Sequence, residues 1–292
     1  MSADRPPFRR PSLRTRLSRS VLPVYVALVV GYLFLPIVVM VLFSFNDPRG
    51  RFNITWQGFT VKNYLDVWSR PDITGPMTNS ILIAIITTII ATVLGTLIGL
   101  ALTRYHFRGR GPLNLLIYVP MATPEVILGA SLLALWASIG VQRGLVTVLL
   151  AHVMFCISFV VITIRARISG FNRSLEEAAM DLGADEWTTF RKVTLPLIFP
   201  GILAAALLSF SLSIDDYVVT LFVSGQTVTF PLWVYGASRF GIPPEVNVLG
   251  TLIFVFAFTL ILLQVLWARR RRSVEEGLAR QSELAAADAS PA

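Results

Sequence analysis

Long apolar stretches alternate with short polar ones along most of this 292-residue chain. A helix needs about 20 consecutive, mostly apolar residues to cross the hydrocarbon core of a bilayer. Six stretches meet this requirement, and they predict membrane-spanning helices over residues 21–45, 79–103, 113–139, 145–164, 201–223 and 248–267. The pattern therefore predicts an all-α polytopic membrane protein with six transmembrane helices.

The third of these stretches contains two prolines, Pro120 and Pro124. Proline lacks a backbone N–H and its ring clashes with the preceding helical turn, so the sequence predicts an interrupted helix here. Backbone groups that a break exposes inside a membrane must bond to protein or to water. The interruption therefore points to the wall of a cavity.

Composition and charge support the membrane assignment. Hydrophobic residues make up 54% of the chain and charged residues 14%, which is too apolar for an ordinary soluble domain. The net charge of +8 comes from short basic runs beside the apolar stretches, without the interleaved aromatic residues of a nucleic-acid surface. We interpret these runs as determinants of membrane topology.

The basic runs predict the orientation of the spans, because arginine and lysine concentrate in cytoplasmic segments. They precede the first span, join the second to the third and the fourth to the fifth, and follow the last. The first apolar run is long and lacks a small-residue cleavage site, so it is expected to stay as an anchor. The predicted parts are a basic cytoplasmic segment 1–20, a transmembrane domain 21–268 with a cytoplasmic loop 165–196, and a cytoplasmic, disordered tail 269–292.

Few side chains offer metal or redox chemistry. Cys156 is the single cysteine, which excludes a disulfide within the chain. The two histidines, His106 and His152, are far apart in the sequence. We therefore predict no metal site, no catalytic residue and no cofactor in this chain.

A polar stretch with a defined spacing lies between the fourth and fifth predicted spans. Asn172 or Ser174 can cap a short helix that begins near residue 175, and two acids in its first turn favour the helix dipole. Gly183 lets the backbone take a conformation that side chains disfavour, so the helix is expected to end there. The downstream apolar positions are typical of a second amphipathic segment before Pro196 opens the fifth span, at Trp187, Phe190 and Val193.

This stretch resembles the signature loop of ABC-importer permeases. The family pattern is Glu-Ala-Ala, three residues, Gly, nine residues, Ile, one residue and Leu-Pro, and here Val193 replaces the Ile. In that family the loop forms a coupling helix that fits a groove on the cytoplasmic ATPase subunit. The resemblance assigns the coupling role to Glu176, Glu177, Ala178, Ala179, Gly183, Leu195 and Pro196. From local chemistry alone, a capped connector between two spans is an equal alternative.

Two acids are the sharpest polar feature of the fifth predicted span, because charge at the bilayer centre is costly. Asp215 and Asp216 are adjacent, so on a helix they point about 100° apart. Asp216 falls in line with small and polar positions, and we predict that it faces a translocation path while Asp215 turns toward a polar partner. The aligned positions are Ala205, Ser209, Ser213 and Thr220. The alternative is that both acids are solvated near the outer end of the span or pair structurally with another helix.

Two further acids follow prolines. Glu125 comes after Thr123-Pro124, where Thr can cap a helix and the dipole favours a carboxylate. This structural role stands beside a role in contacting a cationic substrate, and the sequence favours neither. Glu245, after Pro243-Pro244, is expected to be a helix-start acid.

Over nearly all of its predicted spans the chain also resembles the spermidine/putrescine branch of these permeases. The supporting stretches are residues 155–161, 208–216 and 241–247. The resemblance implies the type I importer permease fold with a five-helix core, a second homologous permease subunit, two copies of an ABC ATPase and an extracytoplasmic substrate-binding protein. It also implies a bacterial inner-membrane location and a polyamine substrate, although related permeases carry iron, thiamine or phosphonate compounds.

The energy source is expected on another polypeptide. The chain has no Gly-x-x-x-x-Gly-Lys-Ser/Thr phosphate loop, so the resemblance implies that ATP and Mg bind the partner ATPase. An ion-coupled carrier that uses Asp215 and Asp216 is the main competing class, but the sequence shows no internal inverted repeat. A membrane-embedded enzyme is the third, and no His, Cys or Ser constellation of suitable spacing supports it.

Overall fold

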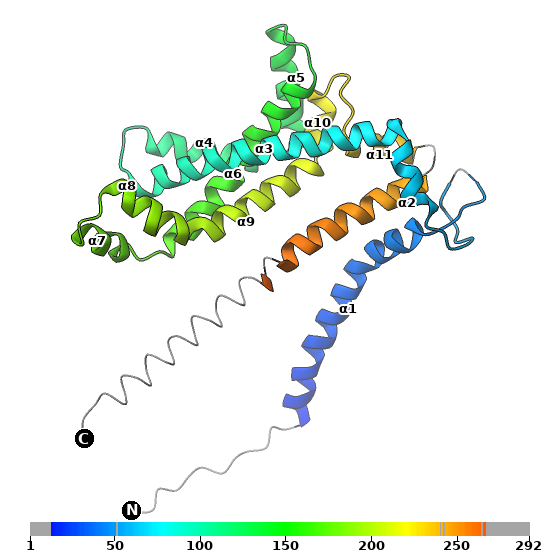
Figure 1. Ribbon diagram of the computed structural model, residues 1–292, viewed down its shortest axis with the longest axis horizontal. Coiled ribbons are helices and arrows are strands. Elements are labelled where there is room, and N and C mark those ends of the chain that lie inside the picture. Colours follow the sequence, from blue (N-terminus) through cyan, green and yellow to red (C-terminus); the bar gives the residue numbers. More distant parts are fainter. Residues whose placement is uncertain (1–12, 51, 240, 242, 264, 267–292) are drawn as a thin grey trace, which may run out of the picture. The chain divides into compact units, whose positions relative to one another are not determined.

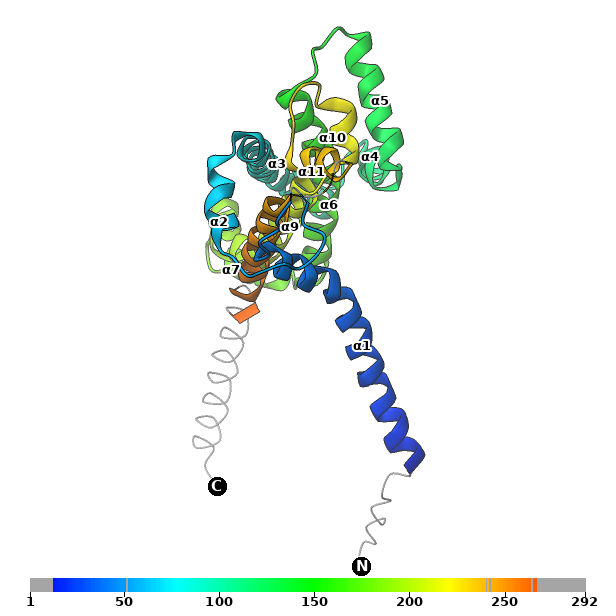
Figure 2. The same ribbon diagram turned by 90° about the vertical axis from the view of Figure 1, so that its right-hand side faces the viewer.

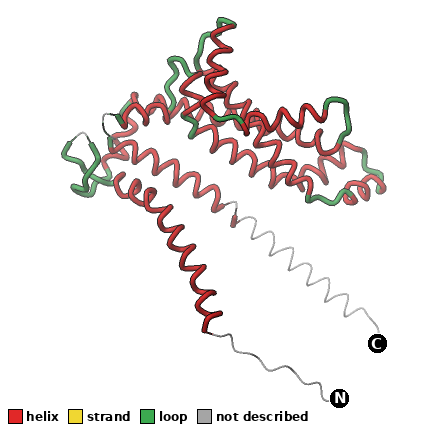
Figure 3. The backbone as a smooth tube through the Cα atoms, turned by 180° about the vertical axis from the view of Figure 1, so that it is seen from behind, coloured by secondary structure: helices red, strands yellow, loops and turns green. Residues whose placement is uncertain are grey.

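The computed structural model describes residues 13–50, 52–239, 241, 243–263 and 265–266. The described part consists of helices and loops, with one isolated antiparallel bridge between Asn46 and Phe59 (Figure 3). The predicted basic segment 1–20 is described only from residue 13, where the first helix begins, and the predicted tail 269–292 lies outside the described residues. The all-α prediction is confirmed.

The chain divides into two compact units, one made of residues 1–69 and 241–292 and the other of residues 70–240. The first, the terminal unit, contains α1 (Leu13–Ser44), the short α2 (Lys62–Asp66), a 3-10 helix η1 (Val67–Ser69) and a helix over Pro244–Leu263. Both long helices are apolar enough to span a membrane, and the apolar stretch of α1 is exposed.

The loop that follows α1 is held by buried asparagines. Asn46 is fully buried; its side-chain amide donates to Asn53 Oδ1 at 2.6 Å and to the Thr55 carbonyl at 2.8 Å. Its oxygen accepts the N–H of Gln57 at 2.7 Å. Hydrogen bonds between its own residues therefore order this loop. It nevertheless exposes large apolar side chains, namely Phe52, Ile54, Trp56 and Phe59.

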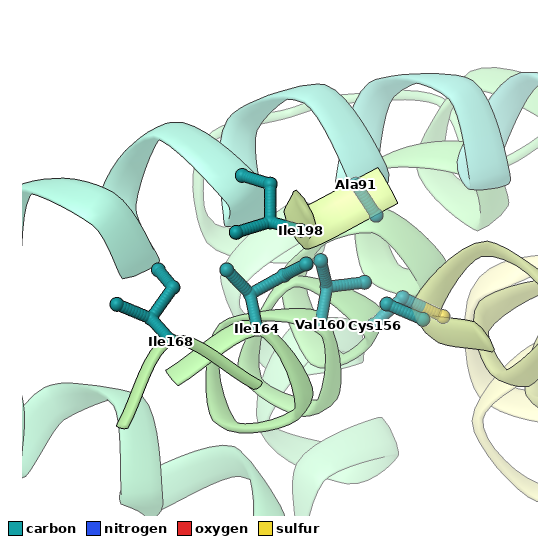
Figure 4. Close-up of a cluster of buried hydrophobic side chains, with 7 residues drawn as sticks. Ala91, Cys156, Val160, Ile164, Ile168 and Ile198 are labelled. Carbon is teal, nitrogen blue, oxygen red and sulfur yellow. The ribbon is translucent and has the colours of Figure 1, made fainter. Parts of the chain in front are cut away.

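The second, central unit is built on three long helices that lie side by side (Figure 1). They are α3 (Pro71–Arg104), α6 (Leu145–Ser169) and α9 (Leu195–Ile214). Buried apolar side chains from all three fill the space between them (Figure 4), including Ala91, Cys156, Val160, Ile164 and Ile198. Between membrane-spanning helices, the close fit of such side chains holds the helices together, because lipid is as apolar as the core.

The third predicted span is bent rather than straight. It forms α4 (Arg110–Ala122) and α5 (Glu125–Ser138), which meet at an angle of 108°. The break falls at Pro124, as predicted, whereas Pro120 lies inside α4. Figure 2 shows α5 beside the short α10 (Val218–Val223), against which it packs.

The fifth predicted span differs from the prediction at both ends. The helix begins earlier, because α8 (Glu186–Thr189) continues through a π-helical turn, η2 (Phe190–Thr194), into α9. It also stops at Ile214, so the prediction of a continuous helix to residue 223 is wrong. The reason is local: the Asp216 carboxylate accepts the backbone N–H groups of Val219 and Thr220, which starts α10 as a separate helix.

Two short helices complete the central unit, α7 (Ser174–Asp181) in the loop before α8, and α11 (Phe230–Ser238) against α3. In the described part of the chain, five helices are long and apolar enough to cross a membrane, and α4 and α5 make a sixth if the bent pair counts as one span. These five to six candidate spans agree with the predicted all-α membrane fold.

Candidate functional site

The polar stretch singled out in the sequence forms α7 at one end of the central unit, close to the end of α3 (Figure 1). Of the two predicted caps, Asn172 engages the helix start, because its side-chain oxygen accepts the N–H of Ser174 at 3.1 Å. Gly183 ends the turn with φ of +88°, in the left-handed region that favours glycine. The predicted short helix and its glycine stop are both present.

The two glutamates of α7 point in different directions. Glu177 is 61% exposed, whereas the Glu176 side chain is 8% exposed and faces inward. Arg104, at the last residue of α3, holds Glu176 with both ends of its guanidinium; its Nη2 donates to Oε1 at 2.6 Å. The hydroxyl of Thr194 donates to the same Oε1. Glu176 is therefore enclosed within the chain, and Glu177 is the glutamate of α7 that faces solvent.

The environment keeps Glu176 charged. Burial by itself raises the pKa of a carboxyl group, but here the hydrogen bonds from Arg104 and Thr194 and the charge of Arg104 outweigh it. The pKa of Glu176 consequently lies below its ordinary value. At neutral pH, α7 is joined to α3 by a full ion pair.

The same loop exposes large apolar side chains. Leu182 is 90% exposed, and Leu175, Met180 and Trp187 are also exposed, as is Glu177. Apolar side chains gathered on a polar loop are typical of a protein-docking surface. The remaining predicted coupling residues continue this loop: Ala178 and Gly183 are exposed, Ala179 is half-buried, and Leu195 and Pro196 open α9.

A cavity of about 430 Å³ lies between the end of α3 and this loop. Its lining mixes apolar and charged side chains and includes Leu100, Arg104, Glu176, Met180 and Phe190. The carboxylate of Glu176 and the guanidinium of Arg104 thus form part of the wall. The loop that contains α7 therefore borders an open space next to the end of α3.

A second polar cluster lies where α9 ends. His152 of α6 is 1% exposed, and its Nδ1 lies 2.8 Å from the Ser213 hydroxyl. Its Nε2 lies 2.9 Å from the Thr220 hydroxyl and 3.3 Å from Asp216 Oδ2. His152 is not among the predicted site residues, although a polar residue in an apolar stretch is a signal that it needs a buried partner.

The two acids next to this cluster have different surroundings. Asp216 has a 6% exposed side chain turned toward His152 and Thr220, and Asp215 is exposed. Asp216 therefore lies with Thr220, as its predicted alignment requires, although the helix stops before both acids. The predicted polar stripe does share one face, but Ser209, Ser213 and Thr220 are buried inside the central unit.

Glu125 is exposed at the start of α5, close enough to Asp215 for their charges to interact. Thr123 does not cap this helix, because its hydroxyl donates back to the Val119 carbonyl of α4. The two exposed carboxylates thus lie at two breaks between helices, Asp215 directly after α9 and Glu125 at the start of α5. Glu245 lies in the first turn of the helix over Pro244–Leu263, at the helix start that the sequence predicted.

Comparison with known proteins decides the family. The sequence pattern of the binding-protein-dependent transport system inner membrane component family matches residues 91–273. The chain belongs to this family. It is 37% identical over 254 residues to the spermidine/putrescine transport system permease protein PotC of Escherichia coli K12, covering 87% of this chain and 96% of PotC. It is also 37% identical over 238 residues to the putrescine transport system permease protein PotI of the same strain, covering 78% and 84%.

The fold agrees with that of a solved importer. The crystal structure of a bacterial ABC transporter involved in the import of the acidic polysaccharide alginate superposes with a TM-score of 0.62. The alignment covers 90% of this chain and 99% of that one at 18% sequence identity, so it shows the fold alone. The resemblance to ABC-importer permeases is confirmed, and the chain is a multi-pass membrane permease subunit.

Proposed function

We propose that this chain is a transmembrane subunit of an ATP-driven importer that moves polyamines, spermidine or putrescine, into a bacterial cell. The observation that carries the substrate is the 37% identity to PotC across 96% of PotC. The exposed pair of Asp215 and Glu125 supports it, because ammonium groups that leave water need compensating charge. We place Asp215, rather than Asp216, on the path.

The partners follow from the family and from the exposed loop. We infer a second homologous permease subunit, two copies of a cytoplasmic ABC ATPase that binds ATP and Mg, and an extracytoplasmic binding protein that delivers the substrate. The surface of Glu177, Leu182 and Trp187 is the proposed contact with the ATPase. This contact requires the loop and both termini to be cytoplasmic, in agreement with the basic runs.

The proposed mechanism is alternating access. Closure of the ATPase pair on ATP moves the docked α7, and the helix that runs from Glu186 to Ile214 carries this movement along the core. The far end of that helix is the break at Asp215, beside the exposed start of α5. A movement at the docking end therefore reaches the two carboxylates proposed to contact the substrate.

The test is uptake by vesicles that contain the whole complex. Labelled spermidine and putrescine are offered with the binding protein on the outer face, with and without ATP inside. We expect ATP-dependent accumulation of at least one of them. ATP-dependent uptake of another solute alone would keep the importer and reject the polyamine, whereas uptake driven by an ion gradient without ATP would reject both.

A further inference from the structure

Arg104, Glu176 and Thr194 join three segments that are far apart in the sequence. Arg104 ends α3, Glu176 lies in the first turn of α7, and Thr194 is the last residue of the π-helical turn before α9. Glu176 bonds to both of the others through its carboxylate. A single acidic side chain therefore connects the docking helix to two different spans.

The connection is enclosed and strong. The side chains of Arg104 and Glu176 are 17% and 8% exposed, and the guanidinium contacts both carboxylate oxygens. The guanidinium also lies 5.7 Å from the centre of the Phe171 ring, just before α7. Two-point contact of this kind fixes orientation as well as distance, and separating buried charges is costly. The end of α3 is expected to follow α7 as one body.

Other contacts of α7 do not provide the same link. The helix packs on α8 and on the π-helical turn, both of which lead into α9. Toward α3, the cavity of about 430 Å³ opens beside the ion pair. Glu177 of α7 and Arg173, just before α7, form a second ion pair, but it is exposed and 4.0 Å long. Among the described residues, the enclosed ion pair that joins α7 to α3 is that of Glu176 and Arg104.

We propose that Glu176 is a positioning residue for energy coupling. It does not contact the ATPase; it transmits displacement of the docked α7 through Arg104 to α3, while Thr194 transmits it to α9. Because α3 packs along both α6 and α9, the two routes move the three-helix core together. This inference rests on the proposed function, since it requires α7 to be the helix on which the ATPase docks.

Coupling is measured as substrate imported per ATP hydrolysed. The complete complex is reconstituted in vesicles, and uptake and ATP hydrolysis are recorded in the same sample. In Glu176→Gln we expect ATPase copurification and hydrolysis close to the parent, with uptake per ATP lowered by about fivefold or more, the size of a typical coupling interaction. In Arg104→Gln we expect the same pattern.

Two controls distinguish a loss of coupling through Glu176 from a loss of ATPase docking and from a loss of protein stability. Glu177→Gln, on the exposed side of the same helix, is expected to weaken ATPase association and to lower uptake and hydrolysis together. The double exchange Glu176→Arg with Arg104→Glu restores opposite charges and is expected to recover part of the uptake per ATP. A role in stability alone would leave that ratio unchanged in every variant that assembles.

The outcomes are distinct. If the parent complex imports solute with ATP and Glu176→Gln keeps the parent ratio, the inference is overturned and the proposed function stands. If the parent complex shows no ATP-dependent uptake, the proposed function itself fails. Should Glu176→Gln not assemble, Thr194→Val keeps the ion pair and removes one link, and an unchanged uptake per ATP in that variant would also overturn the inference.

Discussion

Gly95 of α3 lies directly against Val160 of α6. A Cβ atom at Gly95 would come within 2.6 Å of Val160 Cγ1 and 3.3 Å of the Ile157 carbonyl oxygen. One turn further along, Gly99 meets Ile164 in the same way, with 3.1 Å to its Cγ2. Small residues at such positions let two membrane helices approach closely, so this contact sets the distance between α3 and α6.

Gly95→Ala is expected to destabilise the permease. The added methyl group must push apart two packed helices, and overpacking of this kind costs about 1–3 kcal/mol. The measurement is thermal unfolding of the purified complex in detergent. Gly75→Ala is the matched control on the same helix, because nothing lies within 4 Å of a Cβ there. Equal melting temperatures for the two variants would contradict the close packing.

Gly183→Ala is expected to weaken ATPase association while leaving the spans folded. The residue has φ of +88° with open space around it, so the cost is backbone strain of about 1 kcal/mol rather than a clash. Association is measured as the amount of ATPase that copurifies. Gly170→Ala, in the same loop but without a positive φ, is the control and is expected to behave as the parent.

The spans were predictable because membrane thickness fixes helix length, and the loop helix because its cap and glycine stop are local signals. The end of α9 was not. Helical spacing presumes a continuous helix, and the sequence pattern did not reveal that Asp216 would hold the first N–H groups of α10. A stop of this kind depends on one side chain that turns back on its own backbone.

Long-range partners were equally hidden. Glu176 and Glu177 look alike in the sequence, but Glu176 is held by Arg104, 72 residues away, and by Thr194. His152 reaches Ser213 and Thr220 across 61 and 68 residues. Local pattern therefore located α7 and the adjacent acids, but it could not show that Glu176 is enclosed and Glu177 exposed.

Asp215→Asn and Asp216→Asn are expected to have different effects. Asp215 is exposed, so its amide variant should raise the KM for a cationic substrate with an unchanged melting temperature. Asp216 accepts hydrogen bonds from Thr220 through its carboxylate, and in Asp216→Asn an NH2 donor replaces one accepting oxygen, so this variant should lower stability by about 1 kcal/mol through a lost hydrogen bond. Uptake kinetics and thermal unfolding, measured on both variants, decide. A KM effect confined to Asp216→Asn would restore the orientation inferred from spacing.

The ion pair of Glu176 predicts a pH dependence. Its folded pKa lies below the unfolded value of about 4.3, so its contribution to stability is complete above that pH and is lost as pH falls through the folded pKa. The melting-temperature difference between the parent and Glu176→Gln should therefore stay constant between about pH 7 and pH 5. A difference that already shrinks in this window would show that Glu176 is not held charged.

The buried Cys156 makes the topology testable by labelling. It is the single cysteine of the chain and its side chain is fully buried, so the parent should not react with a membrane-impermeant maleimide. Phe59→Cys, at an exposed position of the loop after α1, should be labelled in intact spheroplasts. Tyr105→Cys, exposed after α3, should be labelled only once the membrane is opened. The reverse pattern would invert the proposed orientation.

The hydrogen bonds of Asn46 and Asn53 affect the rate at which a partner protein can bind to the loop after α1. A flexible loop loses about 1–2 kcal/mol of conformational entropy for each residue that becomes ordered when a partner covers it. Here this conformational entropy is already lost during folding, because the hydrogen bonds of Asn46 and Asn53 order the loop before a partner binds. A protein that lands on Ile54 or Phe59 meets a shape that does not have to rearrange, so capture can proceed in a single step on collision.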